Sequence, residues 1–145
     1  MITCTRRIEF DAGHRVYRHE SKCNNPHGHR YVLEVTAQGL YSEQDDLGRV
    51  IDFSVLNEVI GGWVDRHWDH GFLFWQEDPE LCSLYGFAGL FHQYKHFCMP
   101  TNPTAENIAK YLLFDVDFPE LREAGVGLTQ IVCRETPNCF ATVSR

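Results

Sequence analysis

The sequence predicts a single α+β domain, in which an antiparallel four-stranded sheet carries two helices packed on one face. Strand-like alternation near both ends of the chain, and two helical stripes between them, favour this class. The expected order is strand, strand, helix, helix, strand, strand. A chain of 145 residues, 43% of them hydrophobic, is long enough to bury one core. Residues 1–145 are therefore expected to form one domain.

Four stretches alternate apolar and polar residues, as strands with one buried face do. The expected strands are residues 2–10, 31–38, 129–135 and 139–144, and residues 49–53 are expected to rejoin the sheet. The last two strands are separated by Thr136-Pro137-Asn138, which is a hairpin signal.

Apolar residues recur at helical spacing in two stretches between the strands. The first helix is expected over residues 54–67, with the stripe Leu56, Val59, Ile60, Trp63, Val64 and His67. Ser54 is its expected N-cap and Gly71 its expected stop. The second helix opens at 102–106 (NPTAE), with proline and an acidic residue in the first turn, and runs to Leu113.

Two stretches carry no regular pattern. Residues 11–26 are expected to form a loop, because Gly13, Asn24, Asn25 and Pro26 interrupt regular structure. The segment Phe74–Met99 is rich in aromatic residues and also carries Cys82, His92, His96 and Cys98. The spacing of these four fits no metal motif, so they are expected to be packing residues in a long loop or short helix. The segment is a candidate lid or oligomer contact.

Composition argues against several classes of protein. The formal net charge of −7 argues against general nucleic-acid binding, and no apolar run approaches the length of a membrane span. The opening residues, MITCTRRIEF, contain no apolar signal region, so a cytoplasmic protein with six reduced cysteines is expected.

Against this acidic background, the stretch from 14 to 30 is locally basic. Arg15, Arg18, Lys22 and Arg30 face only Glu20 there. Such a patch suits a small anionic ligand. The alternative for each residue taken alone is a solvated surface charge.

The stretch from Phe10 to Val35 gathers metal-binding residue types. His27 and His29 are two residues apart, so on a strand their imidazoles share one face. His14 would add a third ligand from a neighbouring strand, and three histidines with an open fourth position describe a catalytic zinc site. Cys23 is close enough in sequence to be a working thiol beside the metal. The alternative is packed or surface histidines that cluster by chance.

Two further features suit proton transfer and substrate binding. The pair Asp69-His70 follows the first helix, and Glu135 stands at the end of a strand. A cysteine thiolate is a base or nucleophile, and a histidine held by a carboxylate can pass on its proton. Taken alone, Asp-His at a helix end is more often a cap or a surface turn.

Six motifs occur in order from the first strand to the last: FDAGHR, CNNPHGH, VIDF, WDHGFL, PTAENIA and IVCRETPN. Together they resemble the family of 6-pyruvoyltetrahydropterin and 6-carboxytetrahydropterin synthases. Only Phe74 to about Met99 looks longer than the family's usual connection. The resemblance implies the tunnelling fold, in which subunits join their sheets into a barrel. It also implies trimers that pair into hexamers, with active sites at subunit interfaces.

The resemblance implies a role for each residue singled out above. His14, His27 and His29 would bind zinc. Cys23 would be the catalytic base or acid, with Asp69 and His70 as its proton relay. Glu135 would anchor the pterin ring, with help from Thr104 and Glu106. In the family the substrate is 7,8-dihydroneopterin triphosphate, whose triphosphate is eliminated. Arg15, Arg18, Lys22 and Arg30 are our own candidates for receiving that triphosphate.

The two branches of the family differ in product. The carboxy branch releases acetaldehyde, gives 6-carboxy-5,6,7,8-tetrahydropterin and leads toward queuosine and other deazapurines. The pyruvoyl branch serves biopterin synthesis. The spacing of three residues between Cys23 and His27 resembles the carboxy branch, which we favour, whereas the letters CNNP resemble the pyruvoyl branch. A non-catalytic zinc- or pterin-binding module and a different zinc hydrolase are rival hypotheses, neither of which explains all the motifs.

Overall fold

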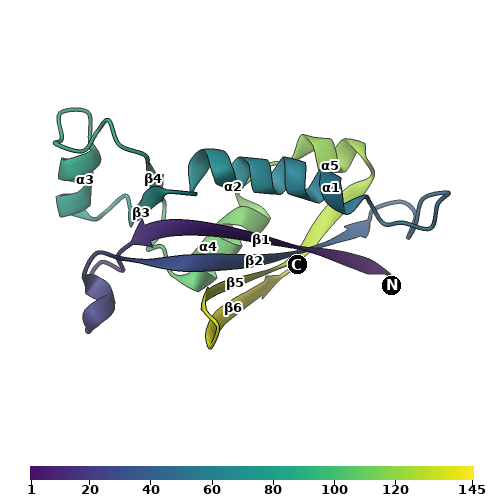
Figure 1. The fold of residues 1–145 in the computed structure, drawn as a ribbon, viewed down its shortest axis with the longest axis horizontal. Coiled ribbons are helices and arrows are strands. Elements are labelled where there is room, and N and C mark those ends of the chain that lie inside the picture. Colours follow the sequence, from purple (N-terminus) through teal and green to yellow (C-terminus); the bar gives the residue numbers. More distant parts are fainter.

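The computed structural model describes residues 1–145 and contains a strongly twisted six-stranded mixed sheet (Figure 1). The strands are β1 (Thr3–His14), β2 (His27–Gly39), β3 (Gly71–Trp75), β4 (His96–Met99), β5 (Val126–Thr136) and β6 (Cys139–Ser144). The helical elements are η1 (Lys22–Asn24), α1 (Phe53–Leu56), η2 (Asn57–Gly61), α2 (Gly62–His67), α3 (Pro79–Tyr85), α4 (Ala105–Phe114) and α5 (Pro119–Glu123). The α+β class is therefore confirmed.

The expected four-stranded antiparallel sheet is only the larger part of the observed sheet. Its strands are β1, β2, β5 and β6, which pair antiparallel in the order β1-β2-β5-β6. The short strands β3 and β4 extend this sheet beyond β1, and both new pairings are parallel. A parallel pair has no hairpin signal in the sequence, because its strands meet only through a long crossover.

The core lies between one face of the sheet and the two longest helical runs. Phe10 on β1, Leu33 on β2 and Ile131 on β5 are almost fully buried against Ile60 of η2 and Ile108 of α4. All belong to one continuous cluster of apolar side chains, so both helical runs cover the same sheet face. This part of the architecture agrees with the expectation of two helices on one face.

The first strand runs four residues further than expected, through residues 11–14, where the sequence predicts a loop. Gly13 is not a breaker there, because it lies within the β1–β2 ladder opposite Gly28. A Cβ at Gly13 would meet Cδ2 of Phe72 at 2.6 Å. The glycine is thus needed for the close approach of β3, and the extension carries His14 onto the sheet.

The predicted helix over residues 54–67 is present as one continuous run through α1, η2 and α2, with a π-type turn in the middle. Two details differ from the prediction. Asp52 is the N-cap, since its side chain accepts from the backbone N–H of Ser54. The expected return to the sheet at residues 49–53 is wrong, because residues 49–52 form the loop and cap that lead into α1 and Phe53 begins that helix.

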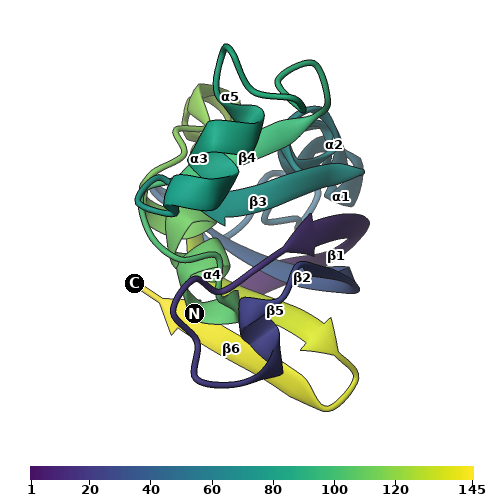
Figure 2. The ribbon, with the colours of Figure 1, turned by 90° about the vertical axis from the view of Figure 1, so that its left-hand side faces the viewer.

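The segment Phe74–Met99 is more regular than a loop. It completes β3, forms α3 and the turn-rich stretch 86–95, and ends in β4 (Figure 2). Asp78 caps α3 and is completely buried, where it accepts two hydrogen bonds from the Arg15 guanidinium at 2.6 and 2.8 Å. The segment is thus tied to the residue that follows His14.

None of the helices has both the length and the apolar character that crossing a membrane requires.

Candidate metal centre and adjoining cavity

The three predicted histidines come together at one end of the central strands. His14 ends β1 and pairs with His27 at the start of β2, while His29 pairs with Ala12. Strand alternation puts all three imidazoles on one face. One nitrogen from each ring can be chosen so that all three lie within 4.8 Å of one another, a grouping that could hold a metal ion. His14 is buried, and the other two are half-buried.

Backbone carbonyls fix the orientation of two of these rings. Nδ1 of His14 lies 2.7 Å from the carbonyl oxygen of Pro103, and Nδ1 of His27 lies 2.7 Å from that of Asn25. Each Nδ1 therefore carries a proton to donate, which leaves the Nε2 lone pair free when the ring is neutral. The two Nε2 atoms face each other at 3.1 Å.

This donor set fits a metal cation. Two lone pairs that face each other at such a distance repel unless a proton or a cation lies between them. Two imidazole nitrogens bound tetrahedrally to one zinc ion would be about 3.3 Å apart, from Zn–N distances of about 2.0–2.1 Å. Burial, together with the neighbouring His27 and His29, lowers the pKa of His14 to about 4, and burial also lowers the pKa of His29. Neutral rings are the form that binds metals.

A cavity of about 210 Å³ adjoins the histidine cluster. Among its lining residues are His14, Cys23, Thr104, Glu106 and Glu135. Five of the predicted site residues, from four separate parts of the chain, therefore surround one cavity. His19, Cys139 and Phe140 also line it, and no signal in the sequence singles out these three.

Two carboxylates share this cavity. Oε1 of Glu135 lies 3.9 Å from Nε2 of His14, and its side chain is 24% exposed. Burial and the nearby Glu106 raise the pKa of Glu135, an effect that His27 partly offsets. Thr104 caps α4, because its hydroxyl accepts from the backbone N–H of Asn107. The cap puts Glu106 in the first turn of α4, where it lines the cavity.

The loop that carries Cys23 is held from both sides. The backbone N–H of Val16 donates to the carbonyl of Cys23 at 2.9 Å. The amide of Asn102 clamps the backbone of Tyr17, accepting from its N–H at 2.8 Å and donating to its carbonyl at 2.9 Å. The sequence pattern indicates only a helix start at Asn102 and Pro103. In the structure, Asn102 also holds the Cys23 loop and Pro103 the His14 ring. Sequence spacing alone does not reveal this second role.

Asp69 and His70 are in direct contact, although adjacency in sequence does not require it. Nδ1 of His70 lies 2.7 Å from Oδ2 of Asp69. The backbone N–H of Asp11 donates to the other Asp69 oxygen at 2.9 Å, and the His70 N–H donates to the Asp11 carbonyl at 2.6 Å. Burial alone would raise the pKa of Asp69, but hydrogen bonds from Asp11 and His70 lower it overall.

The tight turn at this pair is made by His70 itself. Its φ is +56°, so the left-handed position falls here and not at Gly71, which begins β3. The Lys95 ammonium group donates to the backbone carbonyls of Asp65 and Asp69 and so ties the turn to the Phe74–Met99 segment. The pair is thus held rigidly at the end of α2.

The structure does not bring His70 and Cys23 to the same cavity. His70 lines a shallow surface depression together with Asp11, His29 and Arg30. Cys23 lines the cavity on the side of His14. The histidine cluster thus lies between two hollows of one chain, one with the thiol and one with the Asp69-His70 pair.

Two of the four basic residues are engaged within the chain. Arg15 is buried and paired with Asp78 and Glu80, and Arg30 is paired with Asp11 and Glu9. Arg18 and Lys22 are exposed and form no ion pair with a carboxylate of this chain. They are the two members of the patch that remain available to an anion.

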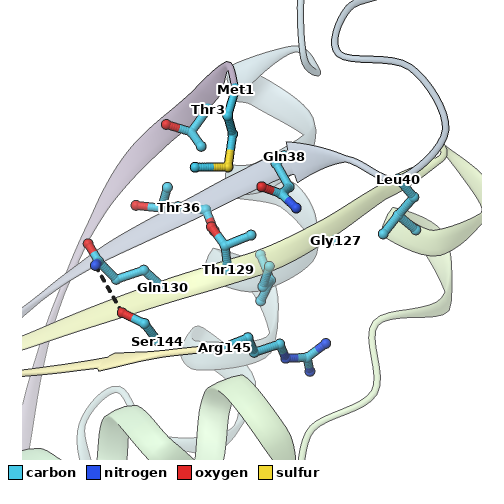
Figure 3. Close-up of a pocket in the computed structure, with 11 residues that line it drawn as sticks. Met1, Thr3, Thr36, Gln38, Leu40, Gly127, Thr129, Gln130, Ser144 and Arg145 are labelled. Atoms are coloured by element: carbon cyan, nitrogen blue, oxygen red, sulfur yellow. Dashed lines mark hydrogen bonds between the residues drawn. The ribbon is translucent and has the colours of Figure 1, made fainter.

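A larger hollow, of about 610 Å³, lies elsewhere. It is formed mainly by the ends of β1, β2, β5 and β6, and its side chains include Thr36, Thr129 and Gln130 (Figure 3). Gln130 donates to the hydroxyl of Ser144 there at 3.0 Å. It contains no histidine, cysteine or carboxylate side chain, so its size does not make it a catalytic site. Cys82, His92, His96 and Cys98 are not part of the group of three histidines that could hold a metal ion.

Comparison with known proteins agrees with the motifs. The family model described as 6-pyruvoyl tetrahydropterin synthase matches residues 3–145. A protein of Rickettsia bellii named 6-carboxy-5,6,7,8-tetrahydropterin synthase is 45% identical over 145 residues, which cover 99% of this chain and 100% of that protein.

Two crystal structures share the fold. An uncharacterised protein of Wolinella succinogenes, WS1659, matches with a TM-score of 0.82 and 23% identity, over 99% of this chain and 98% of the other. The 6-pyruvoyl tetrahydropterin synthase of Plasmodium vivax matches with a TM-score of 0.67 and 20% identity, over 100% and 99%. Since the family model and the Rickettsia relative both span almost the whole chain, the chain belongs to the 6-pyruvoyl tetrahydropterin synthase family.

Proposed function

We propose that this enzyme is a zinc-dependent lyase of the carboxy branch. It converts 7,8-dihydroneopterin triphosphate and one water molecule to 6-carboxy-5,6,7,8-tetrahydropterin, acetaldehyde and triphosphate, a step toward queuosine and other deazapurines. The observation that supports this most is the single cavity in which a thiol and two carboxylates adjoin His14 and, through it, the cluster of three histidines. The 45% identity to the Rickettsia bellii enzyme supports the choice of branch.

Glu135 is suited to hold the pterin ring. A pterin presents adjacent N–H donors on its amino-pyrimidinone edge, and a carboxylate accepts two such donors in parallel. Glu135 stands at the end of β5 with one side toward the cavity, and Thr104 and Glu106 line the cavity wall from α4. Bound in this way, the pterin side chain would extend toward the histidine cluster.

The chain's own residues supply the proton transfers. Cys23 as thiolate would remove a proton from the pterin side chain, and the Asp69-His70 pair would carry protons to and from the reacting carbons. A zinc ion, when bound by His14, His27 and His29, would acidify the substrate hydroxyls and stabilise enolate-like charge. Arg18 and Lys22, beside Cys23, would receive the triphosphate.

A neighbouring subunit is expected to complete the site. The cavity of about 210 Å³ is smaller than the roughly 300–1,000 Å³ of most ligand sites. The Asp69-His70 pair also faces a different hollow from Cys23. We propose a homo-oligomer, trimeric or hexameric, in which the His70 side of one chain closes over the Cys23 side of another.

The second candidate is 6-pyruvoyltetrahydropterin synthase, in which only triphosphate is eliminated. The letters CNNP before the histidine pair favour it. Against it stands the short Cys23–His27 connection, where η1 leads directly into β2. This spacing sets where the thiol lies relative to the metal.

One assay distinguishes the candidates. The purified protein is incubated with 7,8-dihydroneopterin triphosphate while acetaldehyde and pterin products are measured and bound metal is determined by elemental analysis. We expect acetaldehyde and the carboxy pterin in equal amounts, with about one zinc per chain. A pyruvoyl product without acetaldehyde would move the chain to the other branch. Pterin binding without turnover would favour a non-catalytic binding module.

A further inference from the structure

Tyr31 is a buried polar residue beside the site, and no family motif assigns it a role. Its side chain is fully buried, and its hydroxyl oxygen has no hydrogen-bond partner. Only two other buried side-chain atoms share this condition, Nε of Arg6 and Nε1 of Trp68. None of the three residues lines the cavity, but Tyr31 packs against His14 and His29. A buried hydroxyl without a partner costs free energy, so a native protein that keeps one usually has a use for it.

The ring of Tyr31 forms part of the floor beneath the metal centre. Its centroid lies 5.8 Å from that of His14 and 5.5 Å from that of His29, with both pairs of rings nearly perpendicular. On the other side it stacks on Phe10 at 5.0 Å. The ring is therefore locked in place, and its hydroxyl is presented at a fixed position.

Tyr31 and Glu135 lie at the same end of the β2–β5 ladder. The last pairs there are Leu33 with Cys133 and Val32 with Arg134. Tyr31 precedes Val32 on β2, and Glu135 follows Arg134 on β5, where the register with β6 shifts. The two side chains are therefore neighbours at the end of the ladder. Glu135 is also the charged group that acts most strongly on the Tyr31 hydroxyl, after the effect of burial. The charged group with the largest effect on this unpaired donor is thus the carboxylate proposed to hold the pterin.

We propose that Tyr31 is a positioning residue, whose hydroxyl donates a hydrogen bond to the Glu135 carboxylate when a pterin occupies the cavity. This inference rests on the proposed pterin-binding function. A phenol with an ordinary pKa near 10 is protonated at neutral pH and can donate. The hydrogen bond would fix the plane of the carboxylate, so that both of its oxygens meet the N–H donors of the pterin.

The test is Tyr31→Phe, which removes only the hydroxyl. The measurement is the dissociation constant of 7,8-dihydroneopterin, a pterin without the triphosphate, by fluorescence titration of the zinc-loaded protein. Loss of a hydrogen bond to a charged group predicts binding weaker by about ten-fold or more, with unchanged zinc content. In the assay with the triphosphate substrate, KM should rise and kcat should change by less than about two-fold.

A purely structural role predicts a different result. Removing an unpaired buried hydroxyl should leave the thermal midpoint unchanged or raise it. Tyr111→Phe, on α4 and away from the cavity, is the matched control and should bind the pterin as the original protein does. If Tyr31→Phe binds the pterin normally, with or without a change in thermal midpoint, the positioning role is overturned and the proposed function stands.

A double-mutant cycle tests whether Tyr31 acts through Glu135. In the Glu135→Gln background, Tyr31→Phe should weaken pterin binding by much less than ten-fold, because the two side chains act as one unit. Fully additive penalties would overturn the role. If the original protein binds zinc but no pterin at all, the proposed function fails, and this inference fails with it.

Discussion

At the scale of single residues, the proposed site separates metal binding from proton transfer. Backbone carbonyls hold Nδ1 of His14 and of His27 so that their Nε2 atoms face each other, whereas Cys23 lines the adjoining cavity from η1. A thiol that is not a metal ligand remains available as a base. The arrangement thus predicts that the two functions can be lost independently.

We expect Cys23→Ala to retain bound metal and to lose turnover by about 100-fold or more, the usual contribution of a general base. Elemental analysis and the acetaldehyde assay measure the two effects side by side. Cys98→Ala, at an exposed cysteine on β4, is the control and should keep both. Loss of metal from Cys23→Ala would make Cys23 a ligand, and full activity would remove it from the mechanism.

At the scale of elements, the sequence pattern predicted the strands and helices whose formation depends on residues close together in the chain. The alternation of β1, β2, β5 and β6 and the stripes of the two main helical runs follow from burial of one face, so they could be read from spacing. The H-x-H pair on β2 could be read in the same way. These features predicted the class of the fold and the three histidines that come together in the structure.

The parts that were missed depend on partners far away in the chain. Strand β4 has four residues and pairs only with β3, so nothing local distinguishes it from loop. The range 49–53 alternates like a strand, but Asp52 caps α1 there. Arg15 resembled a phosphate-binding residue, and only the fold shows that Asp78 neutralises it. Likewise, the Asn102 clamp joins residues 85 positions apart.

The Arg15–Asp78 pair predicts how strongly the Phe74–Met99 segment is anchored. Asp78→Ala should lower the free energy of unfolding by about 3–5 kcal/mol, because it leaves the Arg15 charge buried without its main partner. Denaturant unfolding of the zinc-loaded protein measures this. Glu80→Gln is the matched control, since this second partner of Arg15 is 70% exposed and its loss should cost less than about 1 kcal/mol. Equal stabilities of the two variants would show that the buried pair is not the anchor.

At the scale of the whole molecule, one chain carries two incomplete halves of the proposed site. The cavity with Cys23 and Glu135 lies on one side of the histidine cluster, and the depression with His70 lies on the other. The sheet also ends in two unpaired edges, β4 and β6. Both features favour an assembly in which chains meet around the metal centres.

Mixed oligomers test this arrangement. Cys23→Ala and His70→Ala should each be inactive as pure proteins. If the two side chains of one working site come from different chains, random hybrids of equal amounts should regain about a quarter of the original activity, because one interface in four then combines both intact residues. Co-expression with two affinity tags and the acetaldehyde assay measure the recovery.

As a control, Cys23→Ala mixed with Glu135→Gln should recover nothing, since these residues line one cavity of one chain. Absence of recovery in the first mixture, with hybrids present, would assign the relay to the same chain as the thiol.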